Sequence, residues 1–186
     1  MPEELYIPII QGTIRRARES IRVAKFIESV AQNYDGIRTE LVDPADFHFV
    51  SDGNDDDNKD PRYSKITSVA DAFFIVVPEY NHSFPGSLKM LLDTELANYI
   101  HKPVAFAGVS SGSWGGVRAI EALNQSVREM GLVSIFSDVH FPKVQTLFDE
   151  KGKIIEAERY TKRVNGALKE LVWMARTLKW GRTNLK

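Results

Sequence analysis

Apolar residues in this chain follow two spacings that alternate along its length. Apolar runs rich in Ile, Val and Phe predict strands over residues 5–10, 37–42, 72–77, 103–109 and 133–136. Apolar residues at i, i+3 and i+4 predict helices over residues 20–31, 86–96, 120–130 and 164–175. The alternation of strands with helices favours parallel strand pairing through crossover helices.

The strand patterns indicate a sheet that is covered on both faces. Residues 72–77 and 103–109 are apolar almost throughout, which is typical of strands buried on both sides, whereas residues 37–42 alternate as an edge strand does. Pro8 in the first strand has no N–H, so we expect it where no ladder hydrogen bond is needed. A chain of 186 residues is long enough for one core. We therefore expect residues 1–186 to form a single doubly wound α/β domain.

Composition narrows the classes of function. A formal net charge of -1 and a pI near 6.4 give no general attraction to nucleic acid or anionic lipid. The absence of Cys excludes zinc ribbons, iron–sulfur clusters and thiolate nucleophiles. No basic leader precedes the first apolar run, and no apolar stretch approaches the roughly 18 residues that a membrane span needs. We therefore expect a cytoplasmic protein that binds neither nucleic acid nor membrane.

An acidic loop and the histidines are the candidate metal ligands. The loop at residues 52–60 fails the EF-hand spacing, because Asp57 stands at the glycine position and Tyr63 at the position of the bidentate glutamate. The four histidines lie far apart in the sequence, at His48, His82, His101 and His140. We predict a solvated loop and no metal site.

The first predicted helix is preceded by the loop GTIRRARES, residues 12–20. Ligands of doubly wound sheets bind beyond the carboxyl ends of the strands, and a helix amino end beside guanidiniums favours an anion. The loop has neither the GxGxxG nor the Walker A spacing, so we do not expect ATP or GTP hydrolysis. Two interpretations stay open here. One is an anion site, and the other is a helix capped by Ser20 with solvated arginines.

Two further loops follow buried strands. The corner PEYN, residues 78–81, combines an aromatic ring with an amide and suits a planar ligand. The loop SSGSWGG, residues 110–116, has glycines that allow close backbone approach and N–H donation. Turn chemistry explains both loops without any ligand. Acid–base catalysis by Glu79 is poorly supported, because no His, Ser or Asp partner is evident near it in the sequence.

Together, the three loops resemble the NADPH-dependent FMN reductase family. The similarity rests on GTIRRARES, PEYNHSFPGSLKMLLD and SSGSWGG and spans nearly the whole chain. It implies a flavodoxin-like, doubly wound α/β sandwich whose five-stranded parallel sheet has the order 2-1-3-4-5 and helices on both faces. Two positions depart from the family pattern: Thr13 stands for the usual serine, and Met90 for the asparagine that commonly follows the LK pair.

The resemblance implies that FMN is held by all three loops. The residues implied for its phosphate are Thr13, Arg15 and Ser20. Those implied for the isoalloxazine ring are Pro78, Glu79, Tyr80 and Asn81 on one side, and Ser111, Gly112, Gly115 and Gly116 on the other. No protein residue is expected to be catalytic, because the flavin carries the chemistry.

The implied activity is an oxidoreductase that moves hydride from NADPH, or from NADH, to bound FMN. An acceptor such as a quinone, azo compound, flavin or metal oxyanion then takes the electrons. Arg16 and Arg18 are candidate contacts for the 2′-phosphate of NADPH. The family also implies a homodimer or homotetramer. The alternative is an FMN-binding electron carrier or sensor without NADPH turnover of its own.

Overall fold

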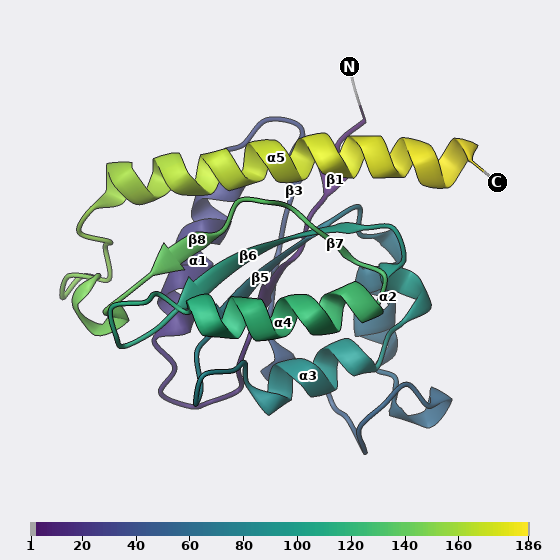
Figure 1. Cartoon of the computed structure of the whole chain (residues 1–186), viewed down its shortest axis with the longest axis horizontal. Coiled ribbons are helices and arrows are strands. Elements are labelled where there is room, and N and C mark those ends of the chain that lie inside the picture. The colour runs from purple at the N-terminus through teal and green to yellow at the C-terminus, as the bar shows by residue number, and fades with distance from the viewer. Residues whose placement is uncertain (1–2, 186) are drawn as a thin grey trace.

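The protein is a sandwich of helices around a parallel sheet (Figure 1). Its computed structural model describes residues 3–185. The main sheet has the path β4 (Leu41–Val42), β2 (Ile9–Gln11), β5 (Phe73–Pro78), β6 (Pro103–Val109) and β7 (Val133–Ser134), with β8 (Val139–Phe141) also paired to β6. A separate two-stranded sheet joins β1 (Leu5–Tyr6) to β3 (Ile37–Arg38). The pairs within both sheets are parallel, as the sequence predicts.

The prediction of a five-stranded sheet is wrong in its strand count, because the main sheet has six strands. Pro8 separates β1 from β2, since proline has no N–H to give to the ladder. The pairing continues on either side of it, where Ile7 donates to the carbonyl of Arg38 and Ile9 to that of Glu40. The strand predicted over residues 133–136 is only two residues long, and β8, which the sequence did not reveal, follows it.

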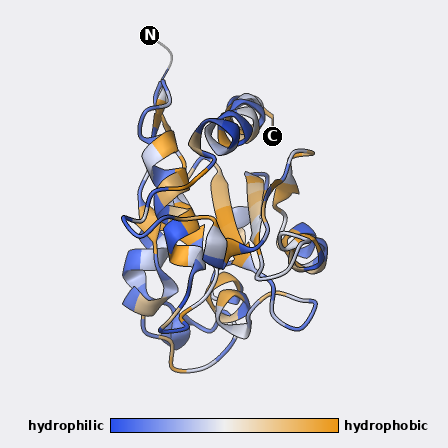
Figure 2. Cartoon of the chain, turned by 90° about the vertical axis from the view of Figure 1, so that its left-hand side faces the viewer, coloured by the Kyte–Doolittle hydropathy of each residue, from blue (hydrophilic) through white to orange (hydrophobic). Residues whose placement is uncertain are grey.

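Within residues 3–185, five helices cover the two faces of the sheet. On one face, α1 (Ser20–Ala31) and α5 (Ala157–Asn184) pack against a core that includes Ile9, Phe74 and Leu171. On the other face, α2 (Pro61–Val69), α3 (Gly86–Asp93) and α4 (Val117–Glu129) share a core that includes Phe73 and Leu91. Figure 2 shows the hydrophobic strands in the middle and hydrophilic helix surfaces outside. Each face therefore contributes its own hydrophobic layer to the stability of the fold.

Several helix boundaries differ from the predicted ones. The sequence did not reveal α2, although Asp60 caps it by accepting from the N–H of Arg62 and Pro61 opens it. Helix α3 begins after Pro85 as predicted but ends at Asp93, so Leu96 lies beyond it and is 43% exposed. Helix α5 is much longer at both ends than its buried stripe indicates. After β8, an antiparallel bridge joins residues 148 and 154.

The acidic loop at residues 52–60 is organised by a buried amide. Asn58 accepts from the backbone N–H groups of Val50 and Ser51 and donates to the carbonyl of Gly53. Most of the aspartates around Asn58 are exposed. Across residues 3–185, the structure contains no cluster of His, Asp and Glu with the geometry of a metal site. Within the same range, no helix combines the length and apolarity needed to cross a membrane.

Candidate functional site

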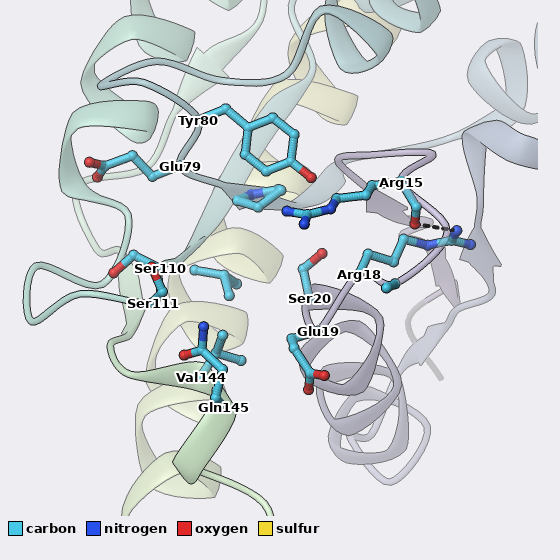
Figure 3. Close-up of a pocket in the computed structure, with 13 residues that line it drawn as sticks. Arg15, Arg18, Glu19, Ser20, Glu79, Tyr80, Ser110, Ser111, Val144 and Gln145 are labelled. Carbon is cyan, nitrogen blue, oxygen red and sulfur yellow. Dashed lines mark hydrogen bonds between the residues drawn. The ribbon is translucent and has the colours of Figure 1, made fainter.

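A cavity of about 370 Å³ opens at the carboxyl end of the main sheet (Figure 3). Its walls come from the loop before α1, the end of β5, the end of β6 and the segment after β8. The lining residues are Arg15, Ala17, Arg18, Glu19, Ser20, Pro78, Glu79, Tyr80, Val109, Ser110, Ser111, Val144 and Gln145. A cavity at this edge, at the lower end of the size range of ligand sites, is where a doubly wound sheet is expected to bind a small molecule.

The loop before α1 is fixed by close contact with β5. The N–H of Gly12 donates to the carbonyl of Val76 at 2.8 Å. A Cβ atom at Gly12 would lie 2.5 Å from that same oxygen, so only glycine fits. The hydroxyl of Thr13 accepts from the N–H of Arg15 at 3.3 Å, which turns the chain toward the cavity. Gly12 therefore anchors the start of this loop to β5.

The arginines of this loop have different environments. The guanidinium of Arg15 extends into the cavity and, within residues 3–185, makes no hydrogen bond or ion pair (Figure 3). Arg18 is tied down by an ion pair with Asp43 and a hydrogen bond to the carbonyl of Arg15. Arg16 is exposed and does not line the cavity. Arg15 is thus the arginine best placed to bind an anion, and the commitment of Arg18 to Asp43 argues against it as a contact for a second phosphate.

Ser20 lines the cavity, and a hydrogen bond from Gln11 orients its hydroxyl group. It is the first residue of α1, and Glu19 holds the N-cap position, so the predicted capping role of Ser20 is wrong. The amide nitrogen of Gln11 donates to the Ser20 oxygen at 2.7 Å. Because that oxygen already accepts a hydrogen bond, the O–H of Ser20 is free to donate. Sequence reasoning missed Gln11, whose only signal was a polar residue at the end of an apolar strand.

The corner after β5 has a strained backbone. Asn81 and His82 have φ values of 49° and 67°, in the left-handed region that non-glycine residues seldom adopt. Backbone hydrogen bonds between Tyr80 and Ser83, at 2.8 and 2.9 Å, close the turn. The Tyr80 hydroxyl lies 3.2 Å from the hydroxyl of Thr13. The corner therefore places the ring of Tyr80 against the loop before α1, while Asn81 is exposed outside the cavity lining.

Glu79 points away from Arg15 and Ser20 (Figure 3). Its carboxylate accepts from the Nε of Arg118 at 2.7 Å and forms an ion pair with the Nη2 of Arg118 at 2.5 Å. Arg118 also lies 2.8 Å from the ring of His82 and 5.6 Å from the centre of the Trp114 ring. The sequence showed no partner for Glu79, because Arg118 is on α4, 39 residues away. This ion pair joins the corner after β5 to the helix that follows β6.

The loop after β6 contributes serines to the cavity and glycines to its support. Ser110 and Ser111 line the cavity. Gly116 crosses the end of β6 so closely that a Cβ atom there would lie 2.4 Å from the nitrogen of Val109. The predicted contacts divide accordingly. Those in the lining are Arg15, Ser20, Pro78, Glu79, Tyr80 and Ser111, and those outside it are Thr13, Asn81, Gly112, Gly115 and Gly116.

The cavity region also contains every buried side-chain atom that lacks a hydrogen-bond partner within residues 3–185. These atoms are the Oε1 of Gln11, the Nε of Arg18 and the Oε2 of Glu79. A buried polar atom without a partner destabilises a fold by about 1–3 kcal/mol. Their concentration at one end of the sheet is typical of a site whose polar groups serve a ligand.

The comparisons with known proteins agree with this geometry. A sequence model described as NADPH-dependent FMN reductase matches residues 5–146. An NADPH azoreductase from Bacillus sp. (strain OY1-2) is 30% identical over 124 residues, which cover 64% of this chain and 66% of that protein. A probable NADPH:quinone oxidoreductase 2 from Oryza sativa subsp. japonica is 30% identical over 177 residues, covering 84% of this chain and 82% of that protein.

Solved structures are similar in fold at lower sequence identity. FerB from Paracoccus denitrificans, a flavoenzyme NAD(P)H:(acceptor) oxidoreductase, aligns with a TM-score of 0.74 at 17% identity. The alignment covers 92% of this chain and 98% of FerB. A flavodoxin from Pseudomonas aeruginosa aligns with a TM-score of 0.59 at 15% identity. The architecture is therefore a flavodoxin-like α/β fold.

Proposed function

Because the chain belongs to the NADPH-dependent FMN reductase family, and is therefore an NAD(P)H-dependent flavin oxidoreductase, we propose that the cavity beyond β5 and β6 holds FMN. The observation that carries this proposal is the side chain of Arg15, which extends unpaired into the cavity beside the amino end of α1. A helix amino end with a free guanidinium is suited to a phosphate.

The phosphate is assigned to Arg15 and Ser20. Arg15 supplies the positive charge, and Ser20 supplies an O–H that Gln11 leaves free to donate. The backbone N–H groups of the first turn of α1 add further donors. Thr13 lies outside the cavity lining, and we assign it an indirect role, since its hydroxyl holds both the N–H of Arg15 and the hydroxyl of Tyr80 in place.

The isoalloxazine ring is assigned to the space between the corner after β5 and the loop after β6. Tyr80 and Pro78 offer apolar surface to a planar group, and Ser110 and Ser111 offer polar groups at the opposite wall. Asn81, Gly112, Gly115 and Gly116 shape the two loops, and any contact they make with the ring is expected to come from the backbone. The ion pair of Glu79 with Arg118 holds the two loops at a fixed separation.

The chemistry belongs to the cofactor, which when bound accepts hydride from NAD(P)H and passes electrons to an acceptor. The chain contributes binding, orientation and partial exclusion of water. The relatives named above as azoreductase and quinone oxidoreductase support an azo compound or a quinone as the acceptor class. Since the cavity is partly open to solvent, both the reductant and the acceptor are expected to reach the ring from the solvent.

The domain organisation, the assembly and the location of the protein are also proposed. We propose that residues 1–186 act as one domain, that β1 with β2 and β3 with β4 correspond to single strands of a 2-1-3-4-5 order, and that the protein is cytoplasmic. We also propose a homodimer or homotetramer, for which the exposed apolar side chains of Met90, Leu96 and Ile100 are candidate contacts.

Two measurements test the function. We expect the purified protein to bind FMN with a shifted visible spectrum, and NADPH to bleach that spectrum rapidly when mixed in the absence of oxygen. Bound FMN that NADPH does not bleach would favour an electron carrier or sensor. Absence of FMN binding, by spectrum and by titration, would remove the assignment of the cavity.

A further inference from the structure

The outward face of α5 carries an exposed stripe of tryptophans and cations. Its members are Lys162, Lys169, Trp173, Arg176 and Trp180, whose spacings of seven, four, three and four residues keep them on one side of a helix. Trp173 and Trp180 are 62% and 60% exposed. The opposite side of α5 packs against the core of the sheet through residues such as Val164 and Leu171. The two tryptophan rings therefore face away from the core, and of the cations Arg176 lies close to Gly36.

The cations of this stripe are available to an outside partner. Within residues 3–185, no ion pair engages Lys162, Lys169 or Arg176. Two other cations of α5, Lys179 and Arg182, are instead directed to Asp71. The stripe thus presents three cations without ion pairs, against the single carboxylate of Glu158 on the same side of the helix, next to two large aromatic rings.

Charge is strongly segregated between α5 and the rest of the molecule. Helix α5 has seven Lys or Arg and two Glu, a formal charge of +5, whereas the other 158 residues have 17 Lys or Arg and 23 Asp or Glu, a charge of −6. The acidic loop at residues 52–60 follows Phe47 and Phe49, which pack on the other face of the sheet. Figure 1 shows that loop on the side of the molecule opposite α5. The net charge of -1 conceals this asymmetry.

We propose that the outward face of α5 docks the protein on an anionic lipid surface. Lys and Arg side chains are attracted to acidic headgroups, and Trp rings are stable at the headgroup level, where one edge is apolar and the other wet. The acidic loop on the opposite side would be repelled by the same surface, so the charge distribution also orients the molecule with α5 toward the lipid. This association is peripheral and reversible, and it requires no spanning helix.

The charges argue against a second copy of this chain as the occupant. A two-fold symmetric contact would place the stripe of one copy against the stripe of the other, and Lys169 and Arg176 would then meet like charges. An anionic bilayer meets the same side chains with opposite charge. The proposal is independent of the flavin site, since no residue of α5 lines the cavity.

Vesicle flotation of the whole protein tests the proposal. We expect binding to vesicles of phosphatidylcholine with roughly one-third phosphatidylglycerol and none to pure phosphatidylcholine, because the attraction depends on headgroup charge. Binding should fall in 0.5 M NaCl, which shortens the screening length to about 4 Å. Trp173→Ala with Trp180→Ala, and separately Lys169→Glu with Arg176→Glu, should each lower the partition coefficient about tenfold or more.

A matched variant distinguishes the effect of this face on vesicle binding from the effect of net charge. Lys65 and Arg128 are exposed on α2 and α4, on the other side of the sheet, so Lys65→Glu with Arg128→Glu changes the net charge equally and should retain vesicle binding. NADPH oxidation by all variants should match the wild type, which shows that they are folded. The proposal is overturned if anionic vesicles do not bind the wild type, or if the matched variant loses binding as fully as the α5 variants. It is equally overturned if the tryptophan variant changes only the oligomeric state seen in sedimentation.

Discussion

Polar side chains at the amino end of the main sheet bind one another, whereas those at the carboxyl end are left with unused groups. At the amino end, Asp71 accepts from the N–H of Tyr6 at 3.0 Å and pairs with Lys179 at 3.1 Å and Arg182 at 3.8 Å. Lys102 donates to the carbonyls of Thr67 and Ser68, at the end of α2.

The carboxyl end differs in the state of its polar groups. Within residues 3–185, the three buried side-chain atoms without partners belong to Gln11, Arg18 and Glu79, all at this end. Left-handed residues do not distinguish the two ends, because Asn81 and His82 lie at the carboxyl end and His101 lies at the amino end, just before β6. Because buried unpaired atoms cost stability, their collection at one end supports the proposed ligand site at the carboxyl end and a structural role for the amino end. Substitutions at the two ends should therefore have separate effects.

The largest effect is expected for Asp71→Ala. This change removes the carboxylate that Lys179 and Arg182 share, so that Lys179 keeps only the exposed Glu3, and it leaves the N–H of Tyr6 without its acceptor. We expect the free energy of unfolding to fall by about 3 kcal/mol. Urea denaturation measures it. Asp71→Asn, which can still accept from Tyr6, should lose less. FMN affinity of the folded variant should be unchanged, and a parallel loss of FMN binding would contradict the division between the two ends.

The next effect is expected for Arg15→Ala. Loss of the cation from the cavity should weaken FMN binding by about 2 kcal/mol, or roughly 30-fold in Kd, because a charge-assisted bond to phosphate is removed. Fluorescence titration with FMN measures it. The free energy of unfolding without FMN should not fall, since this guanidinium has no partner within residues 3–185.

Arg16→Ala is the matched control for this substitution. It removes an equal charge one position along the same loop, from a side chain that does not line the cavity. We expect at most a few tenths of a kcal/mol of change in FMN binding. Equal losses for the two variants would show that the loop acts through its total charge and would sink the assignment of Arg15.

A smaller effect is expected for Gln11→Leu. It removes the donor that orients Ser20, so FMN binding should weaken by about 1 kcal/mol. It also removes the unpaired Oε1 atom, so the apoprotein should be at least as stable as the wild type. Weaker FMN binding together with unchanged or higher stability would support the difference between the two ends of the sheet. Gln11→Glu, with no N–H for Ser20, should lose FMN affinity as well, and retained affinity in both variants would refute the orienting role.

The smallest effect concerns pH at the amino end. Burial, together with the charge of Arg182, lowers the pKa of Lys102 to about 8. The unfolded chain, with an ordinary lysine pKa near 10.4, binds more protons than the folded chain above pH 8, so the free energy of unfolding should rise with pH in that range. After allowance for solvent screening, we expect at most about 1 kcal/mol between pH 8 and 9. Lys102→Met should abolish this rise and Lys65→Met should keep it, and an unchanged slope in Lys102→Met would contradict the assignment.

The central elements were predictable from the sequence because their patterns are local. Residues 73–78 are apolar nearly throughout, and the buried stripe of α1 repeats at helical spacing, so both elements form where expected. Helix α2 was missed because only Tyr63 and Thr67 are buried in it, and two residues make no stripe. The start of α2 is instead marked in the sequence by the dipeptide Asp60-Pro61, a capping residue followed by a first-turn proline.

The site was predictable as three loops and not as a set of contacts. Motifs identified Arg15, Ser20 and Tyr80, whose side chains follow directly from loops at the ends of strands. The partners Gln11 and Arg118 were not found, because their contacts join segments 9 and 39 residues apart and depend on how the strands and helices pack. The sixth strand of the main sheet, β8, was not found, because its three residues are too few to show a strand pattern.

The crowding at Gly12 has a consequence for protein engineering. The N–H of Gly12 bonds to the carbonyl of Val76, and a Cβ atom at position 12 would lie 2.5 Å from that oxygen, so the loop before α1 is anchored to β5. A library that varies position 12 should therefore yield only inactive clones. Redesign toward a cofactor of another size is better directed at Ser111 and Gln145, on the far wall of the cavity. Such a library should keep glycine at position 12.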